Sequence, residues 1–114
     1  MTRSKPSFDN RTLVMDGQRW ELEYPIADAS RIGDQVVVLY HADARRETFG
    51  QFRNLVAFDL RGRRCWEAEL PTNESGDCYV RIASIEPLRA DSWKGFECEL
   101  DSRTGFIVRR TFLK

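Results

Sequence analysis

The stretch WELEYP at residues 20–25 recurs as WEAELP at residues 66–71, an offset of 46 positions. A second echo relates FDLRG at residues 58–62 to LDSRTG at residues 100–105. An internal repeat constrains the architecture, because each unit must bury its apolar face against the next one. We therefore expect an all-β, antiparallel protein made of two repeated blade-like four-stranded units plus an N-terminal hairpin.

Extended segments and turn signals alternate along the chain and leave almost no room for a helix. The run VVVLY at residues 36–40 is typical of a strand that is buried on both faces. In the second repeat, Trp66, Ala68 and Leu70 share one face, which is the two-residue period of a half-buried strand. Similar patterns predict roughly eight to ten short strands in all, with others at residues 12–15, 19–24, 54–60, 78–85, 96–100 and 106–113.

The N-terminal segment and one stretch near the middle of the chain are predicted to be irregular. Residues 1–10 are polar and predict a flexible N-terminal lead, followed by a single β domain over residues 11–114. Residues 43–49 are the best candidate for a helix, but so short a helix is unstable alone. We therefore expect residues 41–51 to form a long hairpin loop with one helical turn at most.

The order of strand, Asp, short glycine turn and Trp-bearing strand resembles the β-propeller repeat of the pyrroloquinoline-quinone type. Residues 59–66 and 101–105 carry the likeness, which extends over residues 12–113 as about two and a half units. The resemblance implies four antiparallel strands per blade, with the Trp packed between neighbouring blades. It brings no quinone or calcium ligands to this chain. Because a closed propeller needs about four or more blades, it implies an open sheet pair or a fragment that completes itself by oligomerising.

Composition and charge argue against several classes of partner. The 114 residues contain 18 basic and 18 acidic side chains, so no net field attracts nucleic acid or an anionic membrane. No apolar run approaches the roughly 18 residues of a membrane span, and no secretory leader is recognisable, so we expect a cytoplasmic protein. Cys65, Cys78 and Cys98 lack metal-site spacing, which predicts reduced thiols, no metal and no cofactor.

The loop at residues 41–51 is the first candidate site. It contains the single histidine of the chain together with charged and aromatic side chains: His41, Asp43, Arg45, Arg46, Glu47 and Phe49. Long loops in compact β domains are often functional, and a histidine beside carboxylates can exchange protons near neutral pH. The competing interpretation is a solvated loop that carries charges of both signs.

The polar turn at residues 90–95 is the second candidate site, because it places Trp93 and Lys94 away from any apolar strand face. An exposed Trp in a turn is a reasonable binding hot spot, and partial packing over a hairpin end is the alternative. The other two tryptophans, Trp20 and Trp66, fit core packing better. The carboxylates at positions 67, 69, 97, 99 and 101 fit the wet face of a sheet, paired with nearby arginines.

These patterns favour a non-enzymatic protein-interaction module, with immunity-type toxin neutralisation as the subclass to test. Such a module would hold a protein partner with its sheet edges and with the loops at residues 41–51 and 90–95. One alternative is a self-assembling half-propeller scaffold, a homodimer joined at an unpaired edge strand. Another is a small hydrolase-like enzyme that uses His41 with Asp43 or Glu47.

Overall fold

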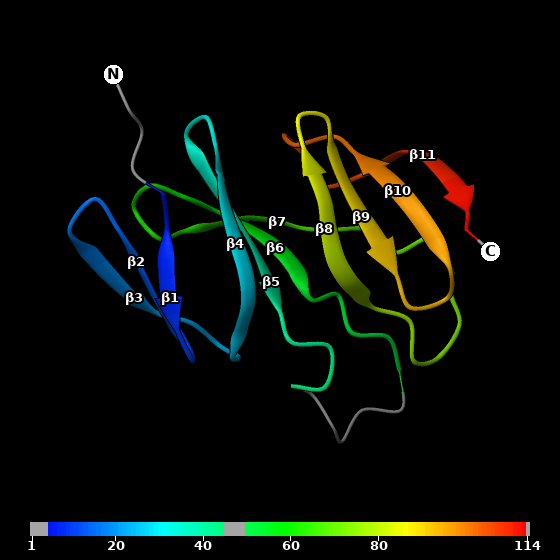
Figure 1. Ribbon diagram of the computed structural model, residues 1–114, viewed down its shortest axis with the longest axis horizontal. Helices are drawn as coiled ribbons and strands as arrows, with labels where there is room; N and C mark the ends of the chain where they lie inside the picture. Colours follow the sequence, from blue (N-terminus) through cyan, green and yellow to red (C-terminus); the bar gives the residue numbers. More distant parts are fainter. Residues whose placement is uncertain (1–4, 45–49, 114) are drawn as a thin grey trace.

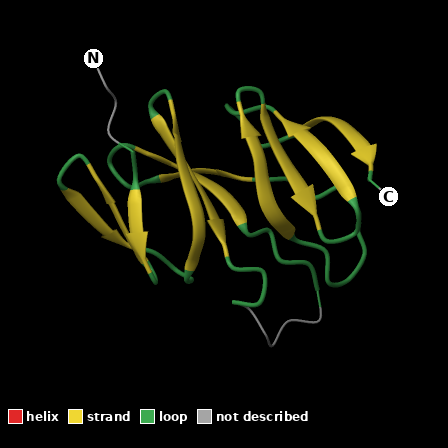
Figure 2. Ribbon diagram, viewed as in Figure 1, coloured by secondary structure: helices red, strands yellow, loops and turns green. Residues whose placement is uncertain are grey.

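The computed structural model describes residues 5–44 and 50–113, and this part of the chain consists of strands, turns and loops (Figure 1, Figure 2). Its eleven strands are β1 (Ser7–Asp9), β2 (Thr12–Met15), β3 (Gln18–Glu21), β4 (Ile26–Ile32), β5 (Gln35–Tyr40), β6 (Leu55–Asp59), β7 (Arg64–Glu67), β8 (Tyr79–Ile85), β9 (Leu88–Ser92), β10 (Phe96–Leu100) and β11 (Ile107–Phe112).

The strands form three antiparallel sheets that follow one another along the chain. The N-terminal sheet has the order β1-β2-β3, the central sheet β4-β5-β6-β7, and the C-terminal sheet β11-β10-β9-β8. In Figure 1 the three sheets stand side by side, with the central sheet between the other two. The expected all-β fold, with two four-stranded units after an N-terminal hairpin, is confirmed, and β1 adds a third strand to that hairpin.

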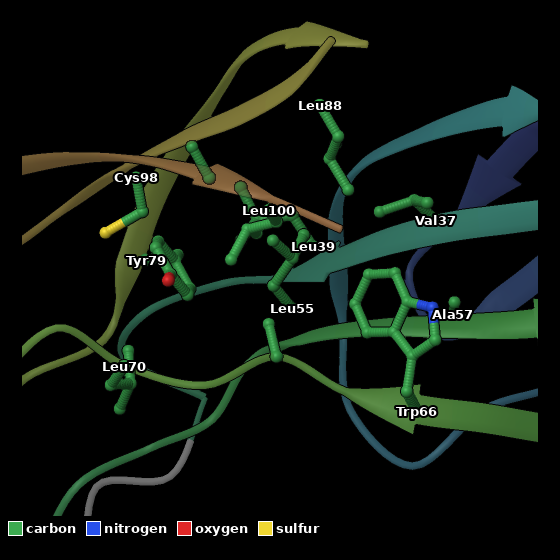
Figure 3. Close-up of a cluster of buried hydrophobic side chains, with 12 residues drawn as sticks. Val37, Leu39, Leu55, Ala57, Trp66, Leu70, Tyr79, Leu88, Cys98 and Leu100 are labelled. Atoms are coloured by element: carbon green, nitrogen blue, oxygen red, sulfur yellow. The ribbon is translucent and has the colours of Figure 1, made fainter. Parts of the chain in front are cut away.

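The central sheet buries both of its faces. Val37 and Leu39 of β5 belong to a core cluster shared with the C-terminal sheet, which Figure 3 shows. Val36 and Val38 point the other way, into a second cluster shared with the N-terminal sheet. All four valine and leucine side chains are buried, as the β-branched run predicts. Strand β6 behaves in the same way, because Leu55 and Ala57 join the first cluster, whereas Val56 and Phe58 join the second.

The repeated tryptophans perform the same packing task at the two junctions between sheets. A Cβ added to Gly62 would lie 2.5 Å from Nε1 of Trp20, and one added to Gly105 would lie 2.6 Å from Cε3 of Trp66. Each indole therefore lies directly on a glycine in the turn of the next sheet. Both glycines also have a positive φ, of 85° and 77°. Only glycine meets both requirements at low cost.

An aspartate organises each of these glycine turns. Oδ1 of Asp59 accepts backbone N–H groups from Arg61 (2.8 Å) and Arg63 (3.0 Å). Oδ1 of Asp101 accepts the backbone N–H of Arg103 at 2.8 Å. The two echoes of the sequence therefore correspond to the same local structure, an aspartate-capped turn that presents a glycine to a tryptophan.

The outer faces of the stack are polar. On the C-terminal sheet, Arg81 pairs with Asp91 (2.8 Å) and Arg89 pairs with Glu99 (3.6 Å). On the N-terminal sheet the register places Arg19 and Glu21 on the outer face, opposite the buried side of β2. Polar outer faces at both ends are typical of a stack of sheets that is capped and remains soluble by itself.

Three features differ from the sequence prediction. β1 lies at residues 7–9, within the segment expected to be a flexible lead, and it pairs with β2. β4 was not predicted, because its sequence IADASRI lacks a clear alternation of apolar and polar residues. β9 takes up residues 90–92 of the expected turn at 90–95, where Ala90 is fully buried. The described residues therefore form more strands than expected, because tertiary pairing recruits segments with no clear pattern of their own.

We expect Trp66→Ala to destabilise the protein by about 3–5 kcal/mol, because it empties a large buried volume and removes the indole from Gly105. Chemical denaturation measures this change. The control is Trp93→Ala, whose side chain is 67% exposed and should change stability by only about 0.5 kcal/mol. A loss below about 1 kcal/mol for Trp66→Ala would contradict the packing described above.

The Asp59 turn should contribute to the acid sensitivity of the fold. Backbone N–H donation from Arg63, followed by that from Arg61, lowers the pKa of Asp59 below its ordinary value of 3.8. The stabilisation is therefore complete above pH 3.8 and is lost as the pH falls through the lowered pKa. We expect Asp59→Asn to be less stable than wild type at neutral pH, with the difference shrinking in acid. Arg63→Ala, which keeps the backbone donor, should retain most of the effect in denaturation series across pH.

Candidate functional site

Four irregular segments meet at one end of the molecule, the lower end in Figure 1. They are residues 41–44, 50–54, 71–78 and 92–95, and we call this region the loop end. Backbone hydrogen bonds join Phe52 N to Asp77 O (3.0 Å), Gly76 N to Gly50 O (3.3 Å) and Trp93 N to Cys78 O (2.8 Å). The two loops singled out from the sequence therefore lie at the same end of the fold, with residues 71–78 between them.

Asn54 connects the central sheet to the C-terminal sheet beneath the loop end. Its Nδ2 donates to the carbonyl oxygens of Tyr40 (2.9 Å) and Tyr79 (2.7 Å), and its Oδ1 accepts the backbone N–H of Tyr79 (2.8 Å). The side chain is fully buried. The amide group of Asn54 thus bonds to the backbone of both β5 and β8, which do not pair with each other. In this way it holds the start of β8 against the end of β5.

Asp77 plays a related part under the second loop. Its carboxylate accepts hydrogen bonds from Thr72 Oγ1 (2.7 Å), from the backbone N–H of Cys78 (3.0 Å) and from the backbone N–H of Lys94 (3.4 Å). This side chain is also fully buried. Hydrogen bonds to a buried carboxylate are strong and directional, so the turn that carries Trp93 is fixed from below.

The residues predicted from the sequence as site residues lie in different parts of the structure. His41 and Asp43 are exposed at the loop end. Trp93 is exposed and Lys94 is half-buried, both in the turn between β9 and β10. The other four candidates, Arg45, Arg46, Glu47 and Phe49, lie outside the described residues.

Two further exposed apolar residues, Phe112 and Leu113, lie at the end of β11, beside the turn that carries Trp93. The exposed fractions of Trp93, Phe112 and Leu113 are 67%, 61% and 40%. Leu113 N donates to Gly95 O (2.6 Å), which holds the end of β11 beside the Trp93 turn. Phe112 packs edge-on against Phe96, with the ring centroids 5.3 Å apart. The turn and the end of β11 are thus adjacent, and sequence reasoning found only the tryptophan.

A groove between the N-terminal and central sheets was missed entirely at the sequence level. Its volume is about 960 Å³. Tyr24 lines it and makes edge-on contacts with Tyr40 and Phe52, with ring centroids 5.3 Å and 5.1 Å apart. Burial raises the pKa of Tyr40. The remaining lining comes from residues 19–23 of the β3 segment and from Gln51, Arg53, Val56, Phe58, Gly62, Arg64 and Glu67.

The thiols and carboxylates do not assemble into a reactive centre in the described part of the chain. Burial raises the pKa of both Cys78 and Cys98, and the charge of Asp77 adds to the effect at Cys78. Cys65 is an exposed free thiol. Glu69, expected on a wet sheet face, is instead half-buried and accepts the N–H of Ile107 at 2.9 Å. Among the described residues no group of three or more potential ligands gathers for a metal, and no helix is long and apolar enough to cross a membrane.

Three stacked antiparallel sheets with a preorganised loop end define this protein as a small all-β domain. The model of the family described as "Domain of unknown function (DUF7957)" matches residues 3–112, and the chain belongs to that family. Searches of curated proteins and of solved structures gave no match. No comparison points to a propeller family, so the resemblance to the pyrroloquinoline-quinone repeat stays a prediction.

We expect Asn54→Ala to destabilise the protein by roughly 2–4 kcal/mol, because three hydrogen bonds are lost and buried backbone groups remain unpaired. Amide hydrogen exchange should show faster exchange at Tyr79 and in the Trp93 turn. The matched control is Asn73→Ala, at an exposed position nearby. Equal stability of the two variants would show that the Asn54 bridge contributes nothing.

Proposed function

We propose that this protein is a non-enzymatic protein-interaction module whose contact surface is the loop end. The observation that carries the proposal is Trp93, which stays 67% exposed although its turn is fixed by hydrogen bonds from below. Exposed tryptophans on rigid supports are favoured binding hot spots, since little conformational entropy is lost on binding. Phe112 and Leu113 extend the apolar area beside it.

Polar side chains elsewhere at the loop end also suit a protein partner. His41 and Asp43 are exposed at the same end, and Lys94 adjoins Trp93. A hydrophobic centre with a polar surround is the usual anatomy of a protein interface. Neutralising a toxin by covering it, the immunity-type role, is one activity that such a surface can perform.

The self-assembling half-propeller would join two chains at an unpaired edge strand, and β3, β7 and β11 are such strands in the described part of the chain, so the oligomeric state distinguishes it from the module. One observation weighs against the enzyme alternative. A hydrolase that uses His41 would place its imidazole in water, because His41 is exposed. Catalytic groups act best where water is excluded.

The test compares Trp93→Ala with Phe106→Ala, a substitution of an equally exposed aromatic residue (64%) in the turn at the other end of β10. A partner recovered from the source cells is purified, and its affinity for each variant is measured by calorimetry. Trp93→Ala should weaken binding roughly 30-fold or more, and Phe106→Ala by less than about twofold.

Equal affinity of wild type and Trp93→Ala would rule out the loop end as the interface. Native mass spectrometry provides a second check. A mass of two chains with no other polypeptide would contradict the proposal and favour the scaffold.

A further inference from the structure

The two junctions between sheets carry equivalent residues but close differently. At the junction of the central and C-terminal sheets, Trp66 Nε1 donates to Ser102 O (2.9 Å) and Glu69 N donates to Gly105 O (2.9 Å). The carboxylate of Glu69 then accepts from Ile107 N, and the Arg110 side chain donates to Pro71 O. Residues 66–71 are therefore bonded along their length to the next sheet.

The junction of the N-terminal and central sheets lacks this closure. Trp20 and Glu23 occupy the repeat positions of Trp66 and Glu69, and Trp20 lies on Gly62. Among the described residues, however, no hydrogen bond joins residues 20–25 to the turn and strand at residues 59–64. Glu23 and Tyr40 both line the groove instead. The groove of about 960 Å³ lies at this open junction.

The groove follows the unpaired edge of β3. Leu22 N donates to Arg11 O at 2.8 Å, so the backbone groups of Leu22 and Trp20 face β2. In an antiparallel strand the intervening residues point the other way, which directs the N–H and C=O groups of Arg19 and Glu21 away from β2. Five consecutive residues, 19–23, line the groove. Since neighbouring side chains lie on opposite faces of a strand, a groove that meets all of them runs along the edge.

We propose that this groove binds an extended peptide segment of a partner protein, which adds to β3 as a further strand of the N-terminal sheet. Addition of a strand to an exposed edge is a recurrent mode of peptide recognition, in which the main chain gives affinity and alternate side chains give specificity. The site is distinct from the loop-end surface around Trp93, and its occupancy does not depend on that surface.

The lining of the groove indicates which side chains the peptide carries. The edge-on cluster of Tyr24, Tyr40 and Phe52 favours an apolar or aromatic side chain on the inward-facing positions. Arg64 is already paired with Glu67 (3.4 Å). Arg19, Arg53, Glu21 and Glu23 are exposed in the lining, so basic and acidic groups balance there, and we expect the aromatic cluster rather than net charge to set the preference for the peptide.

The test uses a phage-displayed library of random peptides about eight residues long, long enough to cover the β3 edge at about 3.4 Å per residue. Selected peptides are synthesised and titrated against wild type, Glu21→Pro and Glu21→Ala. Proline removes the edge-facing N–H and is tolerated on an edge strand, whereas alanine keeps the N–H. We expect Glu21→Pro to weaken binding roughly tenfold or more and Glu21→Ala to change it by less than about threefold.

A second measurement uses the wild-type protein, so it tests the proposal even if Glu21→Pro folds poorly. With a selected peptide bound to wild type, backbone amide shifts should move at residues 19–24 and 62–67. Failure to select any peptide, or shifts confined to the Trp93 turn, would overturn the proposal. Peptides that lose affinity with Trp93→Ala but not with Glu21→Pro would also overturn it, and they would leave the loop-end function intact.

Discussion

The central sheet has two apolar faces, and this constraint determines the rest of the architecture. Val36 and Val38 on one side of β5, and Val37 and Leu39 on the other, can leave water only if a sheet covers each face. The N-terminal and C-terminal sheets supply those covers. The outer face of the C-terminal sheet carries the Arg81–Asp91 and Arg89–Glu99 pairs, and that of the N-terminal sheet carries Arg19 and Glu21, so the stack ends there. A pattern of burial in one strand thus fixes both the number of layers and the polar character of the outer surfaces.

The two junctions show how one repeat can serve two purposes. Both place an indole on a glycine of the next turn, which sets the approach of the sheets. At the C-terminal junction the following residues bond to the neighbouring strand, and the interface is closed. At the N-terminal junction the described residues show no such hydrogen bonds, and a groove remains. A small difference in hydrogen bonding therefore separates a structural junction from a surface that can receive another chain.

The loop end depends on two buried polar side chains in addition to the apolar packing of Phe52 and Cys78. Asn54 bridges strands of two sheets, and Asp77 holds the Trp93 turn from beneath. Buried polar groups are costly unless their hydrogen bonds are satisfied, and satisfied networks specify one arrangement strongly. This arrangement allows loops to carry exposed apolar residues without becoming loose, since their backbones are fixed from within. Rigid support for an exposed Trp93 is the property that links this structure to recognition.

The sequence by itself determined the fold class and the packing of the repeats. Strands with a clear period, such as residues 36–40 and 66–70, were predictable because alternation and β-branching reflect burial directly. The tertiary structure alone decided the rest. Strand β4 has no pattern, because its neighbours rather than its own residues hold it in the sheet. Of the candidate sites, Trp93 was visible as an aromatic residue in a polar turn, but Phe112 joins it only through the fold. The groove was invisible, because its lining comes from residues 19–67, and only the packing of two sheets brings these residues together.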